Sequence, residues 1–259
     1  MANKNVVLAH GILGFGNLTG LPALIHYFNG VAPHLKSQGH NVLEAHVNPI
    51  GSVAQRGDLL AREILGWAPN GDKVHVIAHS MGGLDARHAI TNVAGVKDRV
   101  ATLVTIGTPH RGSPVADAIA NRTGPLLPHV PTFLVEMLRR NAGGLHDLTT
   151  AFCRHFDAAT ADVPNVRYVE IAGDASKGGH ELFLFQLAAI IGKIQGEIND
   201  GVVTKSSALR AGHEHPDDWP VDHAGEVGWD LNTTLLTGVQ PRSGLTAHLA
   251  PYDDLVAKL

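Results

Sequence analysis

The sequence is poor in cysteine, in aromatic residues and in long apolar runs. Among 259 residues there is one cysteine, Cys153, so packing rather than an intrachain disulfide must hold the fold. The most apolar stretch, Leu182–Ile191, is interrupted by Gln186 and is shorter than the ~20 residues that a membrane-spanning helix needs. With 44% hydrophobic residues, the chain is long enough for one large domain with a well-buried core.

Runs of one charge sign are also missing. The chain has 20 basic and 24 acidic side chains, and its longest basic run is Arg139-Arg140. This balance offers no basic surface for a phosphate backbone, so we do not expect a nucleic-acid partner. No signal-peptide pattern opens the chain, which predicts a cytoplasmic location, although a secreted mature form would fit the same sequence.

Histidine, by contrast, is abundant. There are 17 histidines, against 7 phenylalanines, 3 tyrosines and 3 tryptophans. This composition favours either a metal site or proton-transfer chemistry, and the position of each histidine must decide between them.

Short β-type runs alternate with helical patterns, which indicates an α/β fold with a mostly parallel sheet covered by helices. The expected strands are Asn5–Ala9, His40–Val47, Lys73–Ala78, Val100–Ile106 and Arg167–Ala172. The expected helices are Leu21–Ser37, Val53–Trp67, Gly82–Asn92, Glu181–Ile198 and Ala250–Leu259.

The pattern changes after Ser113, and no strand is expected between residues 114 and 163. A helix is predicted at Thr132–Arg140, with apolar residues on one side and charged residues on the other. We expect residues 114–163 to form a helical cap inserted into a single domain that spans residues 1–259. This segment is either an ordinary cover of the core or a lid whose apolar face lies over a pocket.

A serine between a strand and a helix is the strongest chemical signal in the sequence. The predicted strand runs into His79-Ser80-Met81-Gly82 and then into a helix. This arrangement is typical of a nucleophile elbow, a strained turn that lifts a serine hydroxyl above the carboxyl end of a sheet. The turn brings two backbones together, so it requires small residues two positions before and after the serine. Ala78 and Gly82 meet that requirement, and Ser80 is the predicted nucleophile.

Two backbone amides are expected to bind the oxyanion that forms when the serine attacks. The first is the N–H of Met81, because the start of a helix has free donors and a dipole that favours negative charge. The second should come from a loop after an early strand. The glycine-rich segment His10–Gly16 follows the first predicted strand, so Ile12 N–H is the expected donor, although such a segment can also be only a turn.

These motifs together resemble those of the bacterial family I lipases, the group that includes the Pseudomonas, Burkholderia and Proteus enzymes. The matching segments, in the family's order, are Ala9–Gly16, Arg56–Leu60, the serine turn, Val104–Ser113, Asn199–Val203 and Asp222-His223. The resemblance implies an α/β-hydrolase fold, a mostly parallel sheet flanked by helices with a helical cap. It also implies a serine enzyme that acts on acyl esters.

On such a fold the acid and the histidine follow the serine along the chain. The downstream histidines considered for the base are His213, His215, His223 and His248. The resemblance favours His223. It likewise selects Asp200 as the acid over Asp174, which follows a predicted strand and would also lie at the carboxyl end of the sheet. The acid would orient the imidazole and stabilise its charged form.

Four of the other histidines receive no chemical step. His79 is expected to be structural, and the resemblance implies that His110 shapes the wall of the pocket. The spacing of His213 and His215 suits zinc, but no third ligand is fixed by spacing, and a solvated loop is the preferred interpretation.

Two features of the resembled family are missing. Its members hold calcium with an aspartate two positions after the catalytic histidine, where this chain has Gly225, and many of them pair two cysteines. We therefore expect no metal and no other cofactor, and a His223 loop that is held by other contacts.

The sequence thus predicts a carboxylic ester hydrolase, a lipase or esterase that cleaves a lipid or other acyl ester through an acyl-enzyme intermediate. Two alternatives are an acyltransferase on the same scaffold and a non-catalytic binding protein of the same fold. The second alternative would be expected to have a broken triad. Acyl chain length, lid motion and oligomeric state are not determined by the sequence.

Overall fold

The computed structural model describes residues 3–12, 27–67, 72–140, 142–178, 182–229 and 247–259. Within these ranges one sheet of five parallel strands has the order β2-β1-β3-β4-β5. The strands are β1 Asn5–Ala9, β2 Asn41–Glu44, β3 Val74–His79, β4 Val100–Ile106 and β5 Arg167–Ile171. All five predicted strands are present, so the predicted α/β fold is confirmed.

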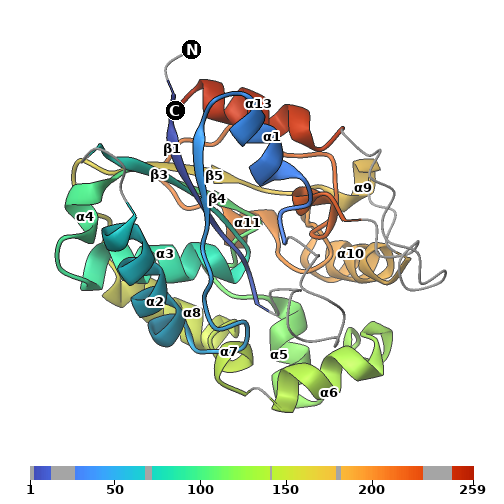
Figure 1. Ribbon diagram of the computed structural model, residues 1–259. Coiled ribbons are helices and arrows are strands. Elements are labelled where there is room, and N and C mark those ends of the chain that lie inside the picture. The colour runs from blue at the N-terminus through green and yellow to red at the C-terminus, as the bar shows by residue number, and fades with distance from the viewer. Residues whose placement is uncertain (1–2, 13–26, 68–71, 141, 179–181, 230–246) are drawn as a thin grey trace.

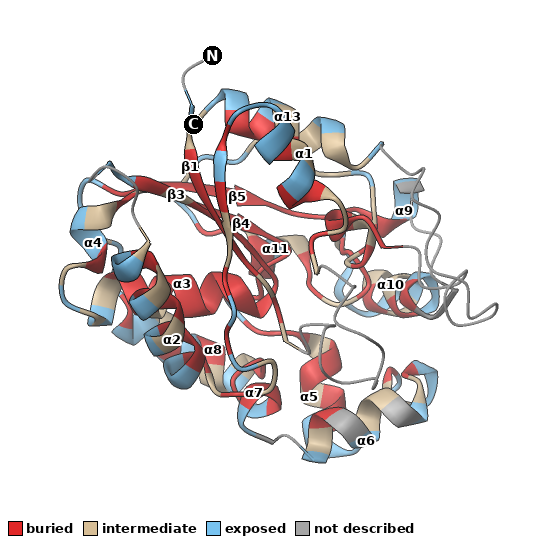
Figure 2. Cartoon of the chain, viewed as in Figure 1, coloured by how far each residue is buried: buried red, intermediate tan, exposed pale blue. Residues whose placement is uncertain are grey.

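Both faces of the sheet are covered by helices, which explains why β1, β3, β4 and β5 are buried along most of their length. On β1, Val6 and Leu8 pack into the cluster that includes residues of α1 (Val31–Ser37) and α13 (Leu249–Ala257). Val7 and Ala9 point to the opposite face and pack with residues of α2 (Val53–Gly66) and α3 (Met81–Asn92). Figure 1 shows these two helix pairs on opposite sides of the strands, and Figure 2 shows that most residues of β1, β3, β4 and β5 are buried.

The longer helices match the sequence patterns that predict them. α2 begins after Ser52, whose hydroxyl accepts a hydrogen bond from Gln55 N–H while the Gln55 side chain accepts one from Ser52 N–H. The apolar helix predicted at 181–198 is α10 (Leu182–Gln195). Of the helix expected at 21–37, residues 21–26 lie outside the described residues. Three helices of four residues each were not predicted: α4 (Val96–Arg99), α9 (Ala175–Gly178) and α11 (Lys205–Ala208).

The segment between β4 and β5 contains helices and loops, as the sequence predicts. Its elements are α5 (Pro114–Asn121), the 3-10 helix η2 (Leu127–His129), α6 (Thr132–Arg140), α7 (Ala142–His146) and α8 (Thr150–Ala159). In Figure 1, α5 and α6 lie beyond the end of the sheet toward which β1 runs. α8 instead packs on the body of the domain, where its Asp157 forms an ion pair with Arg87 of α3 at 2.8 Å.

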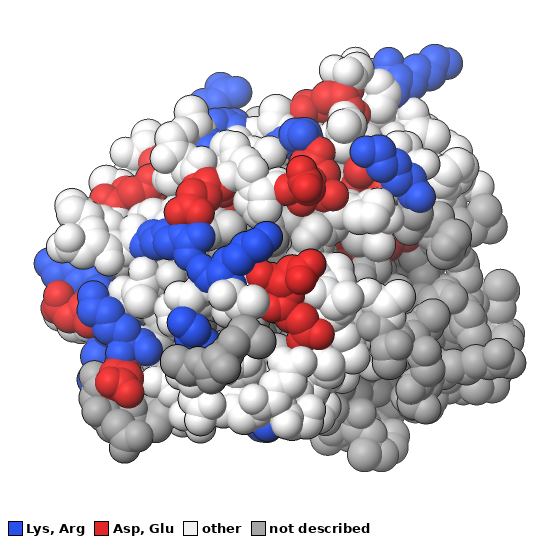
Figure 3. All heavy atoms as spheres, turned by 90° about the horizontal axis from the view of Figure 1, so that it is seen from above, with Lys and Arg blue, Asp and Glu red and all other residues white. Residues whose placement is uncertain are grey.

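Acidic and basic side chains are mixed on the face seen from above Figure 1 (Figure 3). That face therefore carries no broad patch of one sign. Among the described residues, no helix is long and apolar enough to cross a membrane.

Candidate active site

Ser80 lies in a strained turn between β3 and α3. Its backbone has φ 55° and ψ −130°, a conformation that is rare for a residue with a side chain. The turn is held from β4 and the loop after it, because Ser80 N–H donates to the Ile106 carbonyl at 2.9 Å and the Thr108 hydroxyl donates to the Ser80 carbonyl at 2.9 Å. A Cβ atom at Gly82 would collide with the carbonyl oxygen of Ala9. The turn thus requires a small residue at position 82, as the sequence predicts.

Ser80, His223 and Asp200 form one continuous series of hydrogen bonds. His223 Nε2 lies 3.0 Å from Ser80 Oγ, and His223 Nδ1 lies 2.7 Å from Asp200 Oδ2. The other carboxylate oxygen of Asp200 accepts hydrogen bonds from the N–H groups of Val202 and Val203, at 2.8 and 2.6 Å. The structure therefore brings together the three residues that the sequence predicts as nucleophile, base and acid. Both carboxylate oxygens of Asp200 are held by hydrogen bonds.

The alternative acid, Asp174, has other partners. Its Oδ1 accepts hydrogen bonds from the N–H and hydroxyl groups of Ser176 at 3.1 and 2.6 Å, and its Oδ2 lies 3.3 Å from Lys177 Nζ. Burial raises the pKa of Asp174, but these hydrogen bonds and the lysine charge outweigh it and hold the pKa below its ordinary value. Asp174 is therefore a charged residue that stabilises the turn at the start of α9.

The alternative bases also lie in other contacts. His248 Nε2 donates to the Asn29 carbonyl at 2.6 Å. His213 lies between Asp162 and Glu170, at 2.9 and 3.0 Å, and its side chain is only 10% exposed. The prediction of a solvated loop is therefore wrong for His213, because its ring packs against buried β5, whereas His215 is exposed.

The two expected oxyanion donors belong to segments that adjoin Ser80. Met81 is the first residue of α3 and is fully buried. Gly11 passes so close to the nucleophile that a Cβ atom on it would lie 2.8 Å from Ser80 Cβ and 2.5 Å from the Tyr27 hydroxyl. Ile12 is the next residue, so its backbone is in the segment that approaches the serine. Residues 13–16 of the glycine-rich segment lie outside the described residues.

A buried arginine holds residues 10–12, which we call the oxyanion segment. The Arg56 guanidinium donates to the carbonyl of His10 at 2.6 Å and to that of Gly11 at 3.3 Å. It also donates to the carbonyl of Asn48 at 2.7 Å and is paired with Asp85 of α3 at 2.7 Å. Burial raises the pKa of Asp85 to about 7, against the opposing effect of Arg56. In the sequence, Arg56 stands out only as part of a segment that matches the resembled family, and no role is predicted for it.

The loop that carries His223 is held by protein contacts. His223 N–H donates to the Asp200 carbonyl at 3.0 Å. Asp222 Oδ1 accepts hydrogen bonds from the N–H groups of Ala224 and Gly225 at 3.1 and 2.8 Å, which closes a tight turn after the histidine. The turn after His223 is therefore held by hydrogen bonds within the chain.

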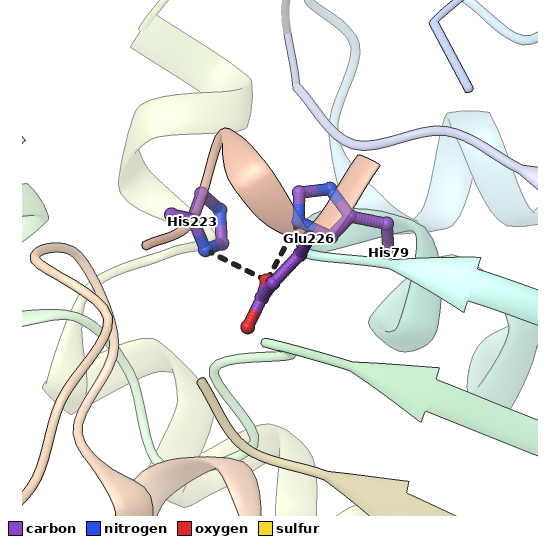
Figure 4. Close-up of side chains that lie close together, drawn as sticks. All are labelled: His79, His223 and Glu226. Atoms are coloured by element: carbon purple, nitrogen blue, oxygen red, sulfur yellow. Dashed lines mark hydrogen bonds and ion pairs between the residues drawn. The ribbon is translucent and has the colours of Figure 1, made fainter. Parts of the chain in front are cut away.

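The residues around His223 do not fit calcium. Gly225 supplies no oxygen ligand from a side chain, and Asp222 Oδ1 is engaged within its own turn. Within the described residues, one group of histidine, cysteine and acidic side chains lies close enough to share an ion, and it consists of His79, His223 and Glu226 (Figure 4). Calcium takes six to eight oxygen ligands, whereas this group offers two imidazoles and one carboxyl.

Two further residues near the site were not predicted. His79 Nε2 lies 2.9 Å from Glu226 Oε2, and His79 Nδ1 lies 2.7 Å from the Tyr27 hydroxyl. The structural role predicted for His79 agrees with these contacts. No motif in the sequence singles out Tyr27 or Glu226. The prediction for His110 is wrong, because its side chain is fully buried against Thr105 rather than exposed on a pocket wall.

Apolar surface is present around α10, as the sequence predicts for that segment. A hollow of about 250 Å³ lies between α5, the turn at 123–126 and α10, and its lining includes Ala118 and Ile191. Phe185 and Ile194 of α10 are 51% and 57% exposed. Ser80 is not among the described residues that line this hollow.

A parallel sheet with a serine on a strand-to-helix turn, followed in the chain by an aspartate and a histidine that reach it from later loops, defines the α/β-hydrolases. This chain has that fold.

Comparison with known proteins agrees with this class. Residues 58–126 match the family described as the PGAP1-like alpha/beta domain. The chain is 29% identical to triacylglycerol lipase 2 of Saccharomyces cerevisiae over 211 residues, which cover 79% of this chain and 63% of the yeast protein. It is also 29% identical to a triacylglycerol lipase of Vibrio cholerae over 268 residues, which cover 91% and 83% of the two chains. The crystal structure of mature Bacillus licheniformis lipase BlEst2 is similar with a TM-score of 0.70 and 24% identity, over 90% of this chain and 89% of that one.

Proposed function

We propose that the chain is a serine carboxylic ester hydrolase, a lipase or esterase that cleaves acyl esters. The observation that carries the proposal is the hydrogen-bond series from Asp200 through His223 to Ser80, at 2.7 and 3.0 Å. In addition, the sequence relatives are named triacylglycerol lipases, and α10 offers apolar surface to an acyl chain. The motif order supports a finer placement with the bacterial family I lipases.

The proposed reaction begins when His223 Nε2 takes the proton from Ser80 Oγ as that oxygen attacks the acyl carbon. The amides of Met81 and Ile12 bind the oxyanion of the tetrahedral intermediate. His223 then donates its proton to the leaving alcohol, and an acyl-serine ester remains. A water molecule deprotonated by His223 attacks this ester, the Ser80 oxygen leaves with the proton, and the carboxylic acid is released. Asp200 stays ionised and stabilises the imidazolium in both steps.

The test is a panel of p-nitrophenyl esters from acetate to palmitate. We expect a burst of p-nitrophenol followed by slower steady-state turnover, and a loss of roughly 10⁶-fold in kcat for Ser80→Ala. Turnover that is equal in Ser80→Ala would overturn the proposal. Adding an alcohol acceptor distinguishes an acyltransferase, because the acyl group would then leave mainly as a new ester and not as the free acid.

A further inference from the structure

A buried carboxyl group lies beneath the proposed catalytic histidine. Glu226 comes from the short helix η3 (Gly225–Val227) and is completely buried. A Cβ atom at Gly107, just after β4, or at Gly173, just after β5, would collide with its carboxyl oxygens. The ends of two neighbouring strands thus leave open the space that this one side chain fills.

The neighbours of this carboxyl group are histidines and acids. Its Oε2 lies 2.9 Å from His79 Nε2 and 3.4 Å from His223 Nδ1, and the rings of those two histidines are 4.5 Å apart (Figure 4). Its Oε1 is buried without a hydrogen-bond partner. The negative charges of Asp200 and Asp222 act on the Glu226 carboxyl. The Tyr252 hydroxyl of α13 donates a hydrogen bond to the backbone carbonyl of Glu226 at 2.9 Å. Among the described residues, no lysine or arginine pairs with Glu226.

A charged carboxylate is costly in this position. Burial without a cation disfavours the ionised form, and two nearby carboxylates disfavour it further. Together they raise the pKa of Glu226 well above its ordinary value of 4.5. Burial lowers the pKa of His79 well below its ordinary value of 6.5, and any positive charge on the adjacent His223 would lower it further, so His79 is neutral. An uncharged carboxyl next to an uncharged imidazole avoids the cost of burying either charge.

We propose that Glu226 is a positioning residue that is held as a neutral carboxylic acid, donates a hydrogen bond to His79, and leaves Asp200 as the one charged carboxyl in contact with His223. His79 then donates from Nδ1 to the Tyr27 hydroxyl, which lies against Gly11 of the oxyanion segment. The hydrogen-bonded chain Glu226–His79–Tyr27 therefore connects the loop of the base to the loop of the oxyanion donor.

The charge state of Glu226 matters for the proposed reaction. A second carboxylate 3.4 Å from His223 Nδ1 would favour the imidazolium before any substrate is bound, and an imidazolium cannot accept the Ser80 proton. A neutral Glu226 keeps its hydrogen bond without this effect. This consequence rests on the proposed function, whereas the protonation state of Glu226 does not.

The protonation state is tested by urea unfolding of the full chain and of Glu226→Gln between about pH 4 and about pH 8. A carboxyl whose pKa is raised by folding destabilises the folded protein as the pH rises above 4.5. The unfolding constant of the unaltered protein should therefore rise relative to that of Glu226→Gln, by up to about tenfold per pH unit. A ratio that is constant over this range would overturn the proposal.

Glu214→Gln is the matched control, because Glu214 is exposed and paired with Arg167 at 2.6 Å, which lowers its pKa. The ratio of the unfolding constant of the unaltered protein to that of Glu214→Gln should not rise with pH. If Glu226→Gln does not fold, carbon NMR of the unaltered protein decides the question. One glutamate carboxyl should keep the chemical shift of a protonated acid at neutral pH, and the absence of such a signal would contradict the proposal.

The positioning role is tested by ester hydrolysis. Glu226→Ala leaves His79 Nε2 without its donor and should lower kcat by about tenfold, with KM little changed, and Gln at this position should restore most of the loss. The acidic limb of the pH profile of kcat/KM should lie at the same pH in the unaltered protein and in Glu226→Gln. A shift of about one unit would mean that the glutamate is ionised. If the unaltered protein hydrolyses no ester, the proposed function fails while the unfolding measurement still decides the state of Glu226.

Discussion

The guanidinium of Arg56 lies 2.7 Å from the carboxylate of Asp85, and neither side chain is exposed. The same guanidinium donates to the carbonyls of His10 and Gly11, so one buried cation connects α2, α3 and the segment that approaches Ser80. Removing one partner of a buried ion pair leaves an uncompensated charge and costs several kcal/mol.

We expect Arg56→Met to lower the free energy of unfolding by about 3–5 kcal/mol, measured by urea denaturation. Replacing Asp85 by Leu in the same chain should recover part of that loss, because the uncompensated carboxylate is then gone. Arg167→Met is the control. Its exposed pair with Glu214 should be worth less than about 1 kcal/mol. Equal losses for Arg56→Met and Arg167→Met would contradict the role assigned to Arg56.

The assignment of the acid is tested by a pair of isosteric variants. Asp200→Asn removes the charge beside His223 Nδ1 and should lower kcat by roughly 10⁴-fold. Asp174→Asn keeps a side-chain oxygen for the N–H and hydroxyl of Ser176, so its kcat should stay close to that of the unaltered protein. Circular dichroism establishes that both variants are folded. The reverse ranking of the two variants would make Asp174 the acid.

The close approach at the serine turn makes a further prediction. In Gly82→Ala the new methyl group meets the carbonyl of Ala9, which belongs to the sheet and cannot move aside. We expect a loss of about 1–3 kcal/mol in stability and a lower kcat. Gly66 is the last residue of α2 and has open space around its Cα, so Gly66→Ala should raise stability by up to about 1 kcal/mol. Thermal unfolding of the two variants measures both effects.

Buried histidines should make the protein sensitive to mild acid. Burial and the Arg56 charge lower the pKa of His10 to about 4, and burial lowers the pKa values of His79 and His110 well below 6.5. These histidines stay neutral in the folded protein but take up protons in the unfolded chain below about pH 6.5. Stability is therefore lost as the pH falls from about 6.5 toward 4, by up to ~1.4 kcal/mol per pH unit for each histidine.

The measurement is the urea midpoint at several pH values between about 7 and about 4.5. Glu226→Gln is the best background for it, because the raised pKa of Glu226 changes stability in the opposite direction in this range. A midpoint that does not change with pH in this background would show that the three rings are accessible to protons in the folded protein.

Chelation is expected to leave ester hydrolysis unchanged. The turn after His223 is closed by Asp222 and has Gly225 where the resembled family has a calcium ligand. The experiment compares turnover and thermal unfolding before and after dialysis against a chelator, and equilibrium dialysis with calcium measures binding directly. Stoichiometric calcium, or activity that is lost on chelation and recovered with calcium, would contradict this prediction.

Local sequence patterns predicted most of the fold. β1, β4 and the helix α6 have the predicted bounds, because continuous apolar runs and helical spacing are local properties. Helices of a single turn, such as α4 and α9, were missed because four residues carry no periodicity. The predicted strand His40–Val47 is longer than β2, which ends at Glu44.

The residues of the candidate site also differ in how far local sequence patterns predict them. Ser80 and Met81 follow from a strand, a turn and a helix that are adjacent in the chain. Asp200 and His223 were selected only with the help of the family resemblance, since spacing alone left Asp174 and three other histidines open. Arg56 and Glu226 received no role, because an arginine in a helix and a glutamate in a loop look like surface residues in a sequence.

The sequence alone was enough to predict the parallel sheet, the position of the serine and the backbone turn that carries it. These features depend on residues within one turn or one strand of each other. Which histidine reaches Ser80 and which carboxyl reaches that histidine became visible only in the folded chain, since 143 residues separate Ser80 from His223. The tertiary structure also decided which charged groups are buried. Burial changes the cost of a charge by several kcal/mol, and it is set by helices and loops that are remote in the chain.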